Sequence, residues 1–248
     1  MKRLFVAAFV AGLSIFPASP LLAASPATYV IPVAAREVQG YTAQWSSSLI
    51  FFNPTEQDVV LRLIHALPLG ASCTDCPTSW TVPPKGRISP QFASGAAVFE
   101  ATGPLAVQHE MRAFDSPQNR TSFQFIPTFD RLIPSGRLVT FAGVAPYGGI
   151  NLFVANPNDF PVTVETWVYE AIDPTTKFAE IPPGQTRLVS LNEYRCALSP
   201  DCIFVGFPPS GSFTVGFRAN GDVSAIMSIV SGLGDAYVIP PHVMPAGE

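Results

Sequence analysis

Charged residues are scarce in this sequence, and their scarcity limits what the protein can bind. Only 13% of the 248 residues are charged, with 14 Lys and Arg, 18 Asp and Glu and a net charge of −4. No basic stripe is available to neutralise phosphates, so the sequence excludes nucleic acid as a partner. The apolar content of 48% also argues against a disordered chain, because enough side chains are available to bury a core.

Groups that carry catalysis or hold metals are equally few. The three histidines have no metal-ligand spacing, and His109-Glu110 does not begin a His-Glu-x-x-His zinc motif because position 113 is Ala113. The Gly-x-Ser-x-Gly elbow of serine hydrolases is missing. We therefore predict that the protein is not an enzyme and has no catalytic residue, no metal site and no cofactor.

One apolar run stands out, and it lies at the start of the chain. Met1-Lys2-Arg3 is followed by apolar residues from Leu4 to Phe16 and then by "PASPLLAAS". A basic start, an apolar stretch and small residues before a break are typical of a secretory signal peptide. A bilayer span would need about 20 apolar residues, so this run is too short to be an anchor. We predict a signal peptide over residues 1–24, with cleavage after Ala24 or, second, after Ala23.

The composition of the remaining chain favours strands. The sequence holds 26 prolines, 18 glycines and 19 phenylalanines, which are typical of short strands joined by tight turns. No long stretch shows the 3.6-residue period of an amphipathic helix. No later run reads as a spanning helix, so we expect no membrane span after signal cleavage. The protein is then secreted, periplasmic or held at the cell surface.

The chain contains an internal repeat. Asn53-Pro54 and Asn156-Pro157 are each preceded by an apolar run and followed by a strand with alternating faces. Pro-Pro pairs at 83–84 and 182–183 recur after them, and Ile-Pro segments recur at 31–32, 126–127 and 239–240. Landmarks repeated in the same order indicate two copies of one domain. We predict two all-β domains, residues 25–127 and 128–248.

Two further features indicate how strands pair. Residues 98–111 and 216–229 each read as a β-hairpin, and Asn220-Gly221 is the strongest short hairpin signal in the chain. The final Ile-Pro segment, residues 236–248, has no domain after it. It is therefore a candidate to pair with the exposed strand edge of another copy of the chain.

The cysteines fall into two local pairs, Cys73 with Cys76 and Cys196 with Cys202. Export places them in an oxidising compartment, where disulfides are the usual state. Three pairings are possible, and we favour the two local ones as disulfides that pin loops. The stretch "SCTDCPTSW" can also be read as a redox pair, which needs a helix N-terminus to lower a thiol pKa, or as half a zinc site.

Trp167 and Tyr169 are the candidate ligand-binding residues. They alternate with Val162, Val164 and Val168, so they face outward if the valines line the core. Exposed aromatic pairs mark binding surfaces, and sugars stack on them. In the alternative interpretation, the pair packs against the other domain or under a loop.

The repeated segments carry a resemblance. "YVIPVAA", the Phe-Asn-Pro and Ala-Asn-Pro turns and the Pro-Pro-Lys-Gly and Pro-Pro-Gly turns resemble immunoglobulin-like repeats of secreted bacterial proteins. The resemblance implies two tandem antiparallel immunoglobulin-like β-sandwich domains after the signal peptide. It also implies a spacer, stalk or adhesion module with no assigned activity.

Three functions remain to be compared. The first is a secreted, non-enzymatic structural or adhesion protein. The second is a carbohydrate-binding module that uses Trp167 and Tyr169 against a surface glycan. The third, an enzyme whose site forms only on folding, has no motif in its favour. The partner is expected to be a surface glycan or another protein.

Overall fold

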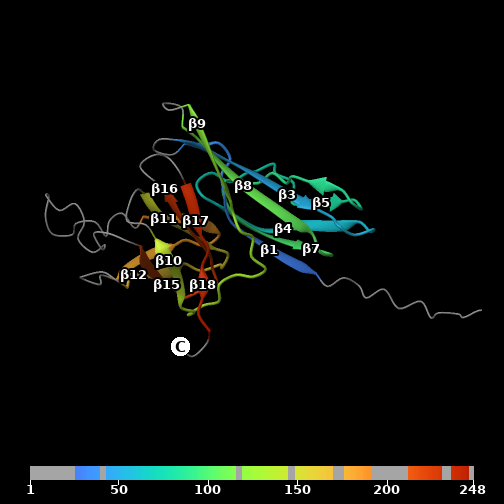
Figure 1. Ribbon diagram of the computed structural model, residues 1–248. Helices are drawn as coiled ribbons and strands as arrows, with labels where there is room; N and C mark the ends of the chain where they lie inside the picture. The colour runs from blue at the N-terminus through green and yellow to red at the C-terminus, as the bar shows by residue number, and fades with distance from the viewer. Residues whose placement is uncertain are drawn as a thin grey trace, which may run out of the picture.

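A computed structural model describes residues 26–39, 43–115, 119–144, 149–169, 176–190, 212–230 and 236–245. These residues are all-β, as predicted, and their strands form four antiparallel sheets. The predicted signal peptide (1–24), Cys196 and Cys202 lie outside the described residues. Figure 1 shows the blue-to-green strands and the yellow-to-red strands as two neighbouring groups, here called the N-terminal half and the C-terminal half.

The N-terminal half contains two sheets that face each other. Sheet 1 has the order β1-β7-β4-β5, and sheet 2 has the order β2-β3-β8-β9 with β6 also pairing with β3. Their inner faces share one apolar cluster that includes Phe51, Leu61 and Phe99, each 0% exposed. The strands are β1 Ala27–Ala34, β2 Val38–Gln39, β3 Gln44–Phe52, β4 Val59–Pro68, β5 Ser79–Val82, β6 Arg87–Ile88, β7 Gly95–Ala101, β8 Ala106–Asp115 and β9 Arg120–Phe125.

The C-terminal half also contains two facing sheets. Sheet 3 has the order β13-β12-β15-β10-β18, and sheet 4 has the order β14-β11-β16-β17. A second apolar cluster lies between them and includes Phe141, Leu152 and Phe217. The strands are β10 Val139–Val144, β11 Gly149–Asn156, β12 Val162–Val168, β13 Lys177–Ile181, β14 Gln185–Ser190, β15 Phe213–Ala219, β16 Ser224–Val230, β17 Ala236–Ile239 and β18 His242–Val243.

The same strand order occurs in both halves. The order β1-β7-β4-β5 in sheet 1 recurs as β10-β15-β12-β13 in sheet 3, and the order β6-β3-β8-β9 in sheet 2 recurs as β14-β11-β16-β17 in sheet 4. The outermost pairing of sheets 1 and 3 is also repeated. Val30 of β1 pairs with Phe129, and Thr140 of β10 pairs with His242. Each half is therefore β-sandwich-like and is built from the same arrangement of strands.

The Asn-Pro and Pro-Pro landmarks of the N-terminal half meet at one buried side chain. Asn53 is 0% exposed, and its Nδ2 donates to the carbonyl of Gln57 at 2.7 Å and of Val82 at 2.9 Å. Its Oδ1 accepts from the backbone N–H of Thr55 at 2.9 Å. Val82 directly precedes Pro83, so the carboxamide links the turn after β3 to the Pro-Pro turn after β5.

Asn156 makes the same contacts in the C-terminal half. It is 0% exposed, and its Nδ2 donates to the carbonyl of Phe160 at 2.8 Å and of Ile181 at 2.9 Å. Its Oδ1 accepts from the backbone N–H of Asn158 at 2.9 Å. Ile181 directly precedes Pro182. A carboxamide is suited to this position because one planar group supplies two donors and an acceptor to backbone that would otherwise be buried without partners.

The two predicted hairpins are wrong. Strands β7 and β8 belong to different sheets, as do β15 and β16. Thr102 directly follows β7, and Asn220 directly follows β15. Each continues the hydrogen bonding of that strand by one residue before the chain crosses to the other sheet. The hydroxyl of Thr102 accepts from the N–H of Val60 at 3.0 Å, and Oδ1 of Asn220 accepts from the N–H of Thr163 at 2.8 Å. The chain then leaves the sheet rather than folding back on it.

Gly221 shows why the Asn-Gly signal was misleading. Its φ is not in the left-handed region that a tight hairpin turn requires. A Cβ at this position would lie 2.6 Å from Cγ2 of Val162. The glycine is therefore needed for the close approach of two segments where the chain crosses between sheets.

The C-terminal segment is paired within its own chain. Strand β17 pairs with β16, and β18 pairs with β10. The backbone N–H of Met244 also donates to the carbonyl of Leu138 at 2.9 Å. The described part of residues 236–248 therefore already has partner strands in its own chain, where it completes sheets 3 and 4.

We expect Asn53→Ala to lower the free energy of unfolding by about 3 kcal/mol or more, since it leaves several buried backbone groups without partners. Urea unfolding monitored by tryptophan fluorescence measures this loss. Gln57→Ala is the matched control, because it removes an exposed side chain from the same turn and keeps the carbonyl that Asn53 binds. We expect the control to stay within about 0.5 kcal/mol of wild type. Equal effects of the two substitutions would contradict the role of the carboxamide.

Candidate binding surface

The contact between the two halves determines which sheet faces stay exposed. The outer face of sheet 4 packs against the N-terminal half through Phe153, Ile226 and Val238, which join a cluster with Val33 and Met111. Strands β11 and β16 contact β1, and β17 contacts β9, so sheet 4 is the sheet that meets the N-terminal half. The outer face of sheet 4 is therefore an internal interface around Phe153, Ile226 and Val238. Leu188 of β14, on the same face, is 46% exposed.

A second contact in this interface involves the outer face of sheet 1. Leu67 and Ala96, 2% and 1% exposed, pack against Ala155 of β11. The hydroxyl of Thr186 donates to the carbonyl of Leu67 and accepts from the N–H of Ala96 at 3.0 Å. One side chain of β14 thus satisfies the backbone of two strands of the other half.

Trp167 and Tyr169 lie on the outer face of sheet 3. Val162, Val164 and Val168 are at most 1% exposed, so the predicted alternation of β12 is present. Tyr169, which directly follows β12, is 49% exposed and Trp167 is half-buried. Their ring centroids are 6.0 Å apart and their planes meet at 67°, so they form an edge-to-face pair.

The backbone beneath Trp167 fits its ring. A Cβ on Gly216 would lie 2.2 Å from the indole, so the ring covers a glycine of β15. Neither Trp167 nor Tyr169 belongs to the apolar clusters that join the two halves. The pair is therefore placed outward on sheet 3 and takes no part in the apolar contact between the halves.

Sequence analysis missed a second aromatic surface, on the outer face of sheet 2. Phe123 and Phe125 of β9 are 59% and 69% exposed, and the guanidinium of Arg112 lies 5.4 Å from the ring centroid of Phe123. Arg112 also forms a salt bridge of 2.5 Å with Glu110. Phe52 and Phe114 are two further exposed phenylalanines in this sheet. The alternation Phe123-Gln124-Phe125 could have revealed the face, but it was used only as a repeat landmark.

A recess of about 440 Å³ lies beside this surface, and its lining includes Tyr29, Leu105, His109 and Phe129. The Tyr29 hydroxyl donates to the Leu105 carbonyl at 3.0 Å and accepts from the Leu105 N–H at 2.6 Å. His109 is 2% exposed, and neither ring nitrogen has a hydrogen-bond partner among the described residues. Burial lowers the pKa of His109 from 6.5 to about 4, so the imidazole is neutral at pH 7.

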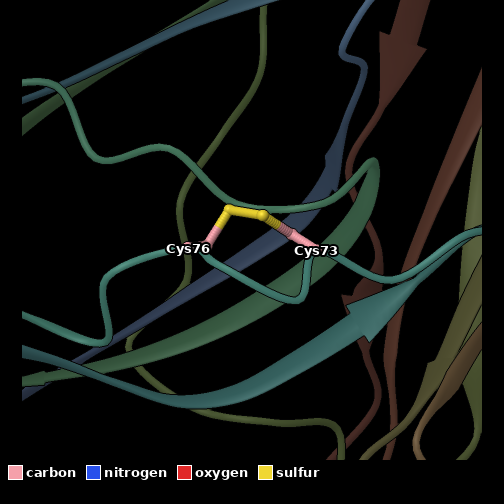
Figure 2. Close-up of a disulfide and its surroundings, with 2 residues drawn as sticks. All are labelled: Cys73 and Cys76. Carbon is pink, nitrogen blue, oxygen red and sulfur yellow. A yellow bond between two sulfur atoms is a disulfide. The ribbon is translucent and has the colours of Figure 1, made fainter.

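The disulfide between Cys73 and Cys76 is present in the loop between β4 and β5, as predicted, with a Cα–Cα distance of 5.6 Å. Figure 2 shows the bond within this loop. Among the described residues, no helix N-terminus lies beside the bond to lower a thiol pKa. The bond closes a short loop at one end of sheet 1.

Within the described ranges, no group of three or more His, Cys, Asp or Glu side chains is arranged to hold a metal ion. No helix long and apolar enough to cross a membrane occurs in the part of the chain that the structure describes. Comparisons with protein-family models, curated proteins and solved structures found nothing that matches this chain. The candidate surfaces must therefore be judged from their own geometry.

We expect His109 to make the folded state less stable in acid. Its pKa is lower in the folded state than in the unfolded state, so the unfolded chain binds the proton more tightly between pH 6.5 and 4. Stability falls as the pH drops through that window, by about 3 kcal/mol from this group. Urea unfolding at a series of pH values measures this slope.

His109→Met provides the comparison, because Met227 occupies the equivalent position in the core of the C-terminal half. The difference in unfolding free energy between His109→Met and wild type should grow as the pH falls from 6.5 to 4. A difference that is independent of pH would show that His109 is not buried in its neutral form.

Proposed function

We propose that this chain is a secreted, non-enzymatic structural or adhesion protein. It consists of two tandem immunoglobulin-like β-sandwich domains, residues 25–127 and 128–248, and it is exported by the signal peptide of residues 1–24. The observation that carries the proposal is that the two halves have the same architecture. Each half has the same strand order and the same buried asparagine, and the halves are joined through an apolar contact.

The surfaces support a role in adhesion rather than catalysis. The exposed apolar groups gather on the outer faces of sheets, where Phe123, Phe125 and Tyr169 are all about half exposed or more. Such faces bind other macromolecules through area and shape and do not need converging acids or bases. The apolar contact between the two halves keeps the two faces on separate sides of the molecule, as a spacer or adhesive module requires.

We expect the protein to be recovered outside the cytoplasm with Ser25 at its N-terminus, as read by mass spectrometry. We also expect the purified protein to bind saturably to immobilised cell-surface material, because apolar side chains are exposed on its faces. Phe125→Ser should reduce this retention, measured by surface plasmon resonance, and Phe160→Ser should not. Phe160 is a matched control because it is 45% exposed in the turn between β11 and β12. A chain that keeps residues 1–24 and shows no retention would contradict the proposal.

A second candidate is binding of a surface glycan by Trp167 and Tyr169. The exposure of Tyr169 favours it, since the aromatic face of a tyrosine can stack on the apolar face of a sugar. A glycan array with wild type and Trp167→Ala tests this idea, and Tyr169→Ala is added because Trp167 also covers Gly216. We expect both substitutions to abolish any glycan signal. No binding by the wild-type protein would rule out this candidate.

A further inference from the structure

The two exposed aromatic faces include positions that correspond to some of those through which the two halves contact each other. This follows from the strand registers. Leu63 and Thr166 both pair with the aligned phenylalanines of β7 and β15, so β4 and β12 can be compared residue by residue. Val98 and Gly216 each directly precede the aligned phenylalanine. His65 pairs with Val98 after a register shift, and Trp167 pairs with Gly216, so His65 aligns with Trp167.

The same comparison aligns Leu67 with Tyr169. Leu67 pairs with Ala96, and the backbone N–H of Tyr169 donates to the carbonyl of Thr214 at 3.0 Å. Leu67 and Ala96 of sheet 1 are buried against Ala155 of the C-terminal half. Their counterparts, Tyr169 and Thr214, lie on the outer face of sheet 3. The outer face of sheet 3 thus corresponds to the part of the docking face that Leu67 and Ala96 form in the N-terminal half.

The other side of the contact also has a counterpart. Aligning Asn53 with Asn156 places Phe52 at the position of Ala155 and Ile50 at the position of Phe153. The same alignment makes Glu110 equivalent to Ser228 in the next strand of each sheet. Phe125 pairs with Glu110 and Val238 pairs with Ser228, so Phe125 is at the position of Val238.

In sheet 4 these positions are covered by the N-terminal half, through Phe153, Ala155 and Val238. In sheet 2 they are open, and Phe52 and Phe125 are 38% and 69% exposed. The outer face of sheet 2 thus corresponds to the docking face of the C-terminal half.

We propose that the chain associates head to tail with a second copy of itself. The outer face of sheet 3, with Trp167 and Tyr169, docks on the outer face of sheet 2, with Phe52 and Phe125, of the next copy. The contact repeats the part of the internal contact that involves Leu67, Ala96 and Ala155. Met111, which also joins the internal contact, corresponds to Ile229 in the core of the C-terminal half and is not repeated on sheet 3. Every chain has one face of each kind, so the association is heterologous and continues into a filament or closes into a ring.

This inference rests on the proposed structural role, and it names a second copy of the chain as the partner. A second copy fits these faces because the repeat already joins the corresponding sheets once within the chain. Aromatic side chains stand at positions where the internal contact has aliphatic ones: Tyr169 aligns with Leu67, and Phe52 aligns with Ala155. Tyr169 and Phe52 are 49% and 38% exposed, and exposed apolar side chains gathered on one face are typical of an interaction surface.

The test uses the full chain, with Tyr169→Lys to block the face on sheet 3 and Phe125→Lys to block the face on sheet 2. Both residues are exposed, so the fold should tolerate the charge, and Phe160→Lys is the control outside both faces. Multi-angle light scattering should show wild type and the control growing beyond dimers as concentration rises. Each blocked variant alone should stay monomeric.

An equimolar mixture of the two blocked variants is the deciding sample. The intact sheet 2 face of Tyr169→Lys can dock on the intact sheet 3 face of Phe125→Lys, so the mixture should form a one-to-one dimer and nothing larger. A mixture that stays monomeric, or a blocked variant that still associates alone, overturns the inference. A monomeric wild type that still binds cell-surface material also overturns it but leaves the proposed function in place, whereas a wild type that does neither overturns both.

Discussion

The carboxamide of Asn53 joins segments that are far apart in the sequence, and Asn156 does the same in the other half. Each Nδ2 donates to the carbonyl of its own turn and to the carbonyl before a Pro-Pro pair. These prolines cannot donate to a ladder, so the backbone around them depends on other partners. A fully buried and fully bonded carboxamide holds the two turns together, and the two facing sheets of each half are aligned around it.

From this constraint follows the way in which the halves meet. Because the two halves have the same strand order, their sheets have equivalent outer faces. Each half therefore has one outer face on its first sheet and another on its second. One pair of these surfaces is closed by Leu67, Ala96 and Thr186 within the chain. The remaining pair is open and carries Tyr169 and Phe125. Repeat proteins in general bury such faces by stacking on neighbours.

Much of the fold was predictable, because alternation reports burial directly. The valines of β12 and the outward Trp167 and Tyr169 followed from a period of two. Asn53-Pro54 and Pro83-Pro84 were read as separate turns, since no local rule indicates that one side chain bonds both. The hairpin predictions at 98–111 and 216–229 were wrong for a related reason. A glycine is needed at position 221 because Val162 approaches it closely, and the sequence does not show which strand lies nearby. The alternation Phe123-Gln124-Phe125 indicates that Phe125 faces outward, but it does not show that the face around Phe125 stays uncovered.

Small-angle X-ray scattering over a range of protein concentrations tests the central claim, that the faces joining the two halves recur at the ends of the chain. The account predicts that the forward-scattering mass rises beyond that of a dimer and that the cross-section of the particle stays constant, as it must when identical units are added end to end. A mass that remains at the monomer, or that stops at a dimer, would contradict the account.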